Sequence, residues 1–234
     1  MIVLSIDSAT ECASCSIIKD DTLLGEINFN YKKQHSVILM PEIESLLKNT
    51  GLSINSIDGF VISKGPGSFT GLRIGIATVK GLSQGTKKPF IGVSSLDSLA
   101  YNVAYTDGII CPIIDALREN VYTALYRFEG ENLIKIKDYF IVSIDDLITE
   151  LNSMNEKVCF IGDALKKFKG KLQSSIKDVR FAPAHLNIVR SSSLGEVGLK
   201  LLKEGKSDNI YNFKPFYLRL SQAEREYINK NGEK

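Results

Sequence analysis

The sequence lacks any apolar run near the roughly 20 residues that a membrane-spanning helix needs. Its start, where a secretory signal would be an uncharged stretch, contains Asp7 and Glu11. It also lacks a strong charge of either sign, because 29 Lys and Arg residues nearly balance 27 Asp and Glu residues. The net charge of +2 is too small by itself to indicate a nucleic-acid-binding surface. These absences predict a compact cytoplasmic protein with no membrane contact.

Histidine and cysteine are scarce, which argues against a metal site. There are two histidines, and His35 has Leu39 rather than a second donor four residues later. One Cys-x-x-Cys pair occurs, without a second pair and without a histidine at ligand spacing. We therefore expect no metal and four reduced structural cysteines, which are Cys12, Cys15, Cys111 and Cys159.

The two halves of the chain share a pattern. Residues 2–7 and 109–115 are apolar runs that end in an aspartate, and each is followed by a β-hairpin, a helix and a strand ending in glycine. This repeat predicts an α/β fold of two related lobes, residues 1–104 and 105–234, with the last helix free or packed back on the first lobe. The helices and final strands are expected at 35–48 and 59–65 in the first copy, and at 143–154 and 157–162 in the second.

A glycine-rich junction, residues 63–75, connects an apolar strand to a helix that Ser68 or Thr70 can cap. Its glycine spacing matches neither the Rossmann fingerprint nor the phosphate loop, which needs a following Lys-Ser/Thr. Two interpretations stay open. The helix N-terminus binds phosphate, or Gly71 and Gly75 let the helix pack closely on its neighbour.

Several sequence blocks resemble the TsaB (YeaZ) family, a relative of the TsaD proteins of the glycoprotease-like family. They occur in the expected order and span nearly the whole chain, at residues 2–10, 35–43, 65–75, 92–100, 112–122, 162–164 and 217–219. The resemblance implies two lobes of the actin, heat-shock chaperone and sugar-kinase group, which are ribonuclease H-like. In that group a nucleotide lies between the lobes.

The same resemblance marks residues where a vestigial nucleotide site would lie, and weak ATP or ADP binding is left open. A carboxylate at the end of a strand can hold Mg²⁺ through water, or it can stabilise the following turn. Asp163 can likewise contact a nucleotide or cap a helix. The candidate residues are Asp7, Ser8, Asp115, Gly162 and Asp163.

No catalytic residue is predicted. TsaD relatives carry a His-x-x-x-His metal pair where this chain has Ser95 and Leu99, and neither side chain is a good metal ligand. The metal-dependent transfer chemistry of the relatives should therefore be absent. A glycoprotease-type peptidase is a further alternative. It has little support, because the sequence offers no histidine paired with a cysteine or serine.

Two predicted helices, 35–48 and 70–84, are apolar on more than one face, so they are either packed in the chain's own core or docked on a partner. As the resemblance implies, they bind TsaD, or a second copy of the chain when TsaD is missing. The interface residues predicted on this basis are His35, Ile38, Leu39, Glu42, Leu46, Leu72, Arg73, Ile76 and Lys80.

The sequence therefore predicts a non-catalytic subunit that binds and activates TsaD in making N6-threonylcarbamoyladenosine beside the tRNA anticodon. TsaE would bind through the TsaB–TsaD complex, and the chain would contact tRNA only indirectly. No cofactor is expected. The alternative is an ATP-binding enzyme of the actin-like group, a phosphotransferase or ATPase, built on Asp7, Asp115, Gly162 and Asp163.

Overall fold

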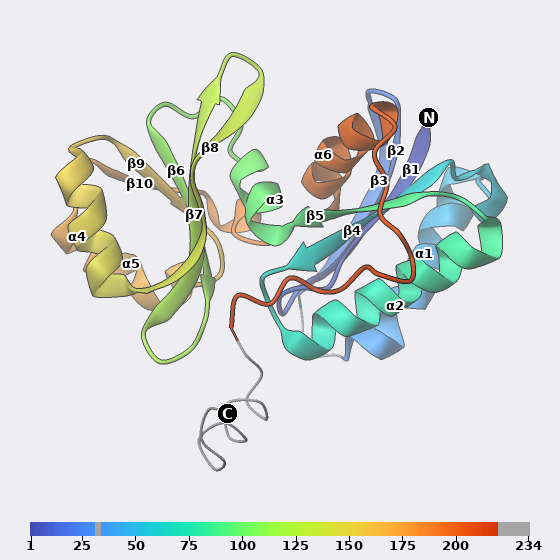
Figure 1. The fold of residues 1–234 in the computed structure, drawn as a ribbon, viewed down its shortest axis with the longest axis horizontal. Coiled ribbons are helices and arrows are strands. Elements are labelled where there is room, and N and C mark those ends of the chain that lie inside the picture. The colour runs from blue at the N-terminus through green and yellow to red at the C-terminus, as the bar shows by residue number, and fades with distance from the viewer. Residues whose placement is uncertain (31–33, 220–234) are drawn as a thin grey trace, which may run out of the picture.

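The computed structural model describes residues 1–30 and 34–219, which form two lobes that each contain a five-stranded mixed sheet (Figure 1). The spatial orders are β3-β2-β1-β4-β5 and β10-β9-β6-β7-β8, so each sheet joins an antiparallel three-stranded meander to two parallel strands. The predicted α/β fold with a repeated lobe is confirmed. The strands are β1 (Ile2–Asp7), β2 (Ala13–Lys19), β3 (Thr22–Phe29), β4 (Gly59–Gly65), β5 (Phe90–Ser94), β6 (Ile109–Asp115), β7 (Asn120–Glu129), β8 (Asn132–Ser143), β9 (Val158–Ile161) and β10 (Val179–Phe181).

Helices cover both faces of each sheet. The predicted helices at 35–48, 70–84 and 143–154 are all present with slightly different ends. None of the described helices is long and apolar enough to cross a membrane. The helices are α1 (His35–Thr50), α2 (Phe69–Thr86), α3 (Ser95–Tyr101), α4 (Ile144–Met154), α5 (Leu165–Ser175) and α6 (Ser191–Lys203), with short 3₁₀ turns at Ile54–Ser56 and Ala184–Leu186.

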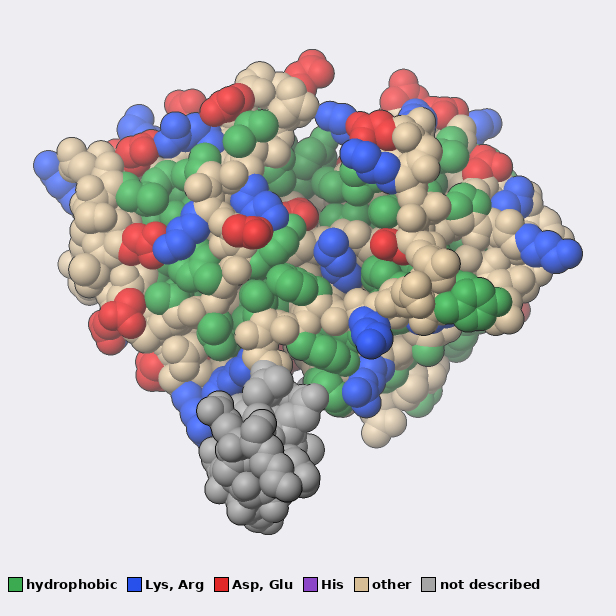
Figure 2. Space-filling view, in the orientation of Figure 1, with side chains coloured by type: hydrophobic (Ala, Val, Ile, Leu, Met, Phe, Trp, Pro, Cys, Tyr) green, Lys and Arg blue, Asp and Glu red, His purple; other side chains and the backbone are tan. Residues whose placement is uncertain are grey.

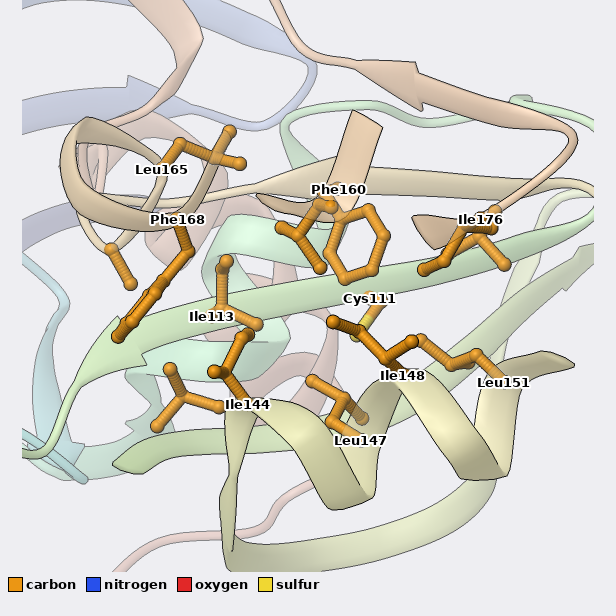
Figure 3. Packing of buried hydrophobic residues seen from close by; sticks show 14 of the residues in the cluster. Cys111, Ile113, Ile144, Leu147, Ile148, Leu151, Phe160, Leu165, Phe168 and Ile176 are labelled. Carbon is orange, nitrogen blue, oxygen red and sulfur yellow. The ribbon is translucent and has the colours of Figure 1, made fainter. Parts of the chain in front are cut away.

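The covering helices are exchanged between the halves of the chain. Helices α1 and α2 cover one face of the first sheet, and α4 and α5 cover one face of the second (Figure 3). The other face of the first sheet is covered by α6, which comes from the second half of the sequence. The other face of the second sheet is covered by α3, which comes from the first half. Helices α3 and α6 contact each other between the two sheets. The end of the chain for which a further helix was predicted lies partly outside the described residues.

A buried ion pair fixes the start of α6 on the first sheet. Glu26 on β3 pairs with Arg190, and its carboxylate also accepts hydrogen bonds from the amide and hydroxyl of Ser192 at 3.0 and 2.6 Å. Burial raises the pKa of Glu26, but these hydrogen bonds outweigh burial and leave the pKa below its ordinary value. The Ser191 amide donates to the Ser14 hydroxyl at 3.0 Å. The helix start therefore has partners for its free amides.

Close packing explains the glycines of the junction before α2. Ser68 caps the helix by accepting from the Gly71 amide at 3.2 Å, as predicted. A Cβ atom on Gly71 would lie 2.1 Å from the Ser8 carbonyl oxygen, and one on Gly75 would lie 2.3 Å from the Ser8 hydroxyl. These separations are far below van der Waals contact, so the close-packing interpretation of the two glycines is confirmed.

Asp7, at the end of β1, is completely buried. Its Oδ1 accepts from the Ala9 amide at 3.3 Å, while its Oδ2 has no hydrogen-bond partner among the described residues. Burial raises the pKa of Asp7 to about 7, against smaller lowering effects of Ser63 and the Ala9 amide. The side chain is thus largely protonated below neutral pH.

We predict that Gly71→Ala destabilises the protein by about 1–3 kcal/mol, since α2 must move away from β1 to admit the methyl group. Gly81→Ala is the matched control on the same helix, where a Cβ would meet no described atom within 4 Å. It should stabilise the helix by up to about 1 kcal/mol. Urea unfolding followed by circular dichroism measures both. Equal effects of the two substitutions would contradict the packing argument.

We also predict that Asp7→Asn becomes more stable than the wild type as pH rises. The unfolded carboxyl ionises near its ordinary pKa of about 4, but the folded one stays protonated until about 7. The stability that protonated Asp7 contributes is therefore present below pH 4 and lost as pH rises toward 7. The variant's advantage at pH 8 over pH 4 should be on the order of 1–4 kcal/mol by urea unfolding. Asp107→Asn, at an exposed site, should show no such trend. Parallel pH curves for wild type and Asp7→Asn would contradict the assignment.

Candidate functional site

A cavity of about 880 Å³ lies between the lobes. The first lobe contributes the loop after β1 and the turn before α2. The second lobe contributes the end of β6, its following turn and the start of α5. The chain segment 216–219 also lines it. The residues around it include Thr10, Glu11, Pro66, Phe69, Ile114, Asp115, Leu117, Tyr122, Asp163, Lys166, Lys167, Phe216, Tyr217 and Arg219.

Two of the predicted nucleotide-site carboxylates lie together at this cavity, and both accept hydrogen bonds from backbone amides. Asp163 accepts from the Asp115 amide at 3.0 Å, and Asp115 accepts from the Leu117 amide at 2.8 Å. Burial, with a smaller contribution from the Asp115 charge, raises the pKa of Asp163 to about 6 despite the lowering effect of the Asp115 amide. The alternative that Asp163 caps α5 is wrong, because that helix starts after Ala164 without a side-chain cap.

Gly162 has a structural reason to be glycine. Its φ is +124°, and a Cβ there would lie 2.1 Å from the Ile113 carbonyl oxygen. Its amide donates to Asn187 Oδ1 at 3.1 Å. The residue therefore lets the end of β9 approach β6 closely.

The other two candidates, Asp7 and Ser8, do not line the cavity. Asp7 is completely buried, and the Ser8 hydroxyl donates to the Gly71 carbonyl at 2.8 Å. The structure thus brings Asp115 and Asp163 together and leaves Asp7 and Ser8 as packing groups under α2.

The turn after Asp115 is a feature that the sequence did not predict. Leu117, Arg118 and Glu119 all have φ between +53° and +63°, which is the left-handed region. Such a run persists only where neighbours enforce it. The Asp115 bond to the turn is one restraint, and Asn120 donates its side-chain amide to the Arg118 carbonyl at 3.0 Å.

Charged side chains connect the rim of the cavity. Lys166 of the second lobe lies 3.4 Å from Glu11 of the first, and Lys167 lies 2.5 Å from Glu119. Both pairs are largely exposed, so each contributes little to stability. Arg219 donates to the Ala116 carbonyl. The cations are thus balanced by local acceptors.

Most of the predicted partner residues point inward, and this corrects the predicted interface. The apolar stripe of each helix packs on its own sheet, so five predicted contacts belong to the core: Ile38, Leu39, Leu46, Leu72 and Ile76. The large hydrophobic side chains that are exposed on α1 are Val37, 64% exposed, and Met40, 48% exposed. The hydrophobicity of these residues in the sequence did not distinguish the buried side chains from the exposed ones.

The polar members of the predicted interface mostly have partners within the chain. A ring nitrogen of His35, Nε2, lies 2.8 Å from the Thr10 carbonyl oxygen, and Lys80 donates to the Phe213 carbonyl at 2.9 Å. Arg73 is exposed and donates to the Tyr217 hydroxyl at 3.2 Å. One oxygen of Glu42, Oε2, is buried without a partner among the described residues.

No group of three or more His, Cys, Asp or Glu side chains within residues 1–30 and 34–219 is placed to hold a metal ion. At the two positions where the resemblance implies a histidine pair in TsaD proteins, Ser95 donates to the Pro66 carbonyl at 2.9 Å, and Leu99 is buried in the core. The four cysteines are buried and free.

Comparison with known proteins gives a consistent family. The family model described as TsaD, tRNA N6-adenosine threonylcarbamoyltransferase, matches residues 22–227. The tRNA threonylcarbamoyladenosine biosynthesis protein TsaB of Bacillus subtilis is 33% identical, with 97% of this chain and 98% of the relative covered. The protein of the same name from Escherichia coli is 26% identical, with 95% and 96% covered.

A solved structure agrees in fold. YeaZ from Pseudomonas aeruginosa superposes with a TM-score of 0.75 at 19% identity and covers 93% of this chain and 99% of its own. The predicted family resemblance is therefore confirmed by sequence over nearly the full length and by the fold. This chain belongs to the TsaB (YeaZ) family, within the wider group that the TsaD model describes.

Proposed function

We propose that this chain is a non-catalytic subunit that binds and activates TsaD in the synthesis of N6-threonylcarbamoyladenosine in tRNA. Its place in this modification is supported by its family, whose members carry that biosynthetic name. The observation that carries the partner proposal is the pair of exposed apolar side chains Val37 and Met40 on α1. They lie three residues apart and so on one side of the helix.

The surface that we propose for TsaD is the α1–α2 outer face, which we define as Val37, Met40, Arg73 and Ala77. All four are exposed, and Ala77 is small enough to admit a closely packed helix. The TsaD family model spans both α1 and α2, which supports a related helix pair in TsaD itself. The apolar side chains that this chain offers to such a helix pair are Val37 and Met40, since the rest of the stripe packs on its own sheet.

A role without catalysis agrees with the site. The cavity carboxylates Asp115 and Asp163 hold a turn, Asp7 is completely buried, and Leu99 stands where the resemblance implies a metal ligand in TsaD. The contribution of this chain is then a docking surface for TsaD. Docking would activate TsaD by selecting one arrangement of its lobes, and the size of the effect is limited by the difference in affinity for the two arrangements.

In this proposal TsaE is met through the TsaB–TsaD complex, and tRNA is contacted indirectly. When TsaD is missing, the same α1–α2 outer face pairs two copies of the chain. No nucleotide is required by the chain itself, so a Mg-ATP titration of the purified protein should show no saturable binding. Tight binding would favour the ATP-using alternative.

We predict that Val37→Glu and Met40→Glu each weaken the complex with TsaD of the same organism by at least about tenfold, because a charge would be buried without a partner. Both residues are exposed in the free chain, so the melting temperature should change little. Met154→Glu, at a 36% exposed methionine on α4 of the other lobe, is the matched control. Light scattering and calorimetric titration measure the complex. Unchanged binding in both α1 variants would place the interface elsewhere.

We further predict that omitting this chain abolishes most tRNA modification in a mixture of TsaD, TsaE, tRNA and threonylcarbamoyl-adenylate. The chain alone should form no product, since the transfer is assigned to TsaD. Val37→Glu should lower product formation and recover part of it at high protein concentration, as expected for weakened docking. Nucleoside analysis by mass spectrometry gives the yield. Full activity without the chain would refute the activating role.

A further inference from the structure

The last described segment crosses from the first lobe to the second. After α6 the chain runs over β5 and the end of β4, past α2, and reaches the second lobe (Figure 1, orange to red). Hydrophobic side chains are visible at the surface of this face on both sides of the boundary between the lobes (Figure 2). We call residues 208–219 the interlobe strap.

The strap is joined to the first lobe through hydrogen bonds to backbone groups of β4 and β5. The Asp208 amide donates to the Phe90 carbonyl at 2.8 Å, and the Gly92 amide donates to the Asp208 carboxylate at 2.7 Å. The Phe216 amide donates to the Lys64 carbonyl at 2.7 Å. The strap is therefore hydrogen-bonded to β5, the edge strand of its sheet, and to the end of β4.

Aromatic packing reinforces this attachment. The Phe213 ring meets Phe90 edge to face, with centroids 5.1 Å apart. A Cβ on Gly92 would lie 2.4 Å from the Phe213 ring, so the strand is shaped to admit that ring.

The far end of the strap contacts the second lobe. The Phe216 ring lies 5.3 Å from the Tyr139 ring of β8, and Arg219 donates to the Ala116 carbonyl at the end of β6. Phe216 and Arg219 also line the interlobe cavity. The strap thus joins the lobes on the side where the cavity separates them.

Between Phe216 and Arg219, the strap also contacts Arg73 of the α1–α2 outer face. Tyr217 stacks on Phe69 with centroids 4.9 Å apart and accepts the hydrogen bond from Arg73. The Arg73 guanidinium also lies 3.9 Å from the centroid of the Phe69 ring. A partner that contacts Arg73 would therefore disturb Tyr217, one residue from Phe216.

We propose that the interlobe strap is a clamp that sets the angle between the two lobes and couples that angle to the α1–α2 outer face. When Tyr217 is held by Phe69 and Arg73, Phe216 and Arg219 keep the cavity side closed. When Arg73 is taken by a partner, the clamp loosens and the second lobe moves. The coupling to TsaD rests on the proposed function, whereas the clamp itself is a property of the free chain.

The test measures the distance between spin labels on Lys48→Cys of α1 and Gln173→Cys of α5, which are exposed and in different lobes. The native cysteines do not compete for the label, because all four are buried, and burial raises the pKa of Cys12, Cys15 and Cys111 to about 12. Electron–electron resonance then gives the distribution of distances between the lobes.

In the free chain, Phe216→Ala with Arg219→Ala should broaden this distribution about twofold or shift it, because the second-lobe contacts are removed. Tyr211→Ala is the control within the same segment, since Tyr211 is 84% exposed. It should leave the distribution unchanged. Circular dichroism and thermal unfolding verify that each variant is folded. If the double variant were to lose its fold, Tyr217→Phe, which removes only the hydroxyl bond to Arg73, should still broaden the distribution. An unchanged distribution in a folded double variant, or in Tyr217→Phe where that variant replaces it, overturns the clamp.

Adding TsaD separates the clamp from the coupling. TsaD should shift the distance in wild type and shift it less in Tyr217→Ala, in which the link to Arg73 is already broken. If TsaD does not bind at all, the proposed function fails while the clamp result in the free chain stands. If TsaD binds but the distance does not move in either protein, the coupling is wrong.

Discussion

The arrangement of this molecule depends on one feature, which is that neither half of the chain covers both faces of its own sheet. Helix α3 leaves the first half to lie on the second sheet, and α6 leaves the second half to lie on the first. Each lobe therefore borrows its inner layer from the other. The Tyr126 and Tyr139 hydroxyls of the second sheet donate to Asp97 on α3 at 2.6 and 2.7 Å, which fixes the borrowed helix in place. Separating the lobes would expose both inner faces, so the lobes are expected to fold as one unit.

The same feature leaves the two sides of the lobe boundary very different. On the inner side, α3 and α6 form a packed apolar layer. On the outer side lies a cavity of about 880 Å³ with charged pairs at its rim. The family resemblance seen in the sequence left open a vestigial nucleotide site between the lobes. Here Asp115 and Asp163 accept hydrogen bonds from backbone amides, and Phe216 and Tyr217 of the chain itself contribute to its wall.

The sequence predicted the strands, hairpins and long helices well because their signals are local. Apolar runs, polar turns and a capping Ser68 depend only on neighbouring residues. The direction in which a helix faces is different. Leu39 and Met40 are adjacent and both apolar, yet one is buried and the other is half exposed. Only the position of the sheet decides between them. The exchange of α3 and α6, the left-handed turn at 117–119 and the strap likewise depend on contacts between distant residues, for which the sequence has no periodic signal.

The energies of the two sides decide where a partner could act on the shape of the molecule. The inner side buries large apolar side chains, and each fully buried one is worth about 1.5–3 kcal/mol. Opening several of these contacts would approach the whole stability of a typical domain, about 5–15 kcal/mol. The outer side is held by one aromatic contact, worth about 0.5–1.5 kcal/mol, and by hydrogen bonds worth about 1 kcal/mol each. A binding partner can typically redistribute about 1–3 kcal/mol between two states. That range matches the energy of the strap's contacts with the second lobe. It falls well short of the energy needed to open the inner layer of α3 and α6. Any movement of the lobes produced by binding should therefore pivot about α3 and α6 and open or close at Phe216 and Arg219.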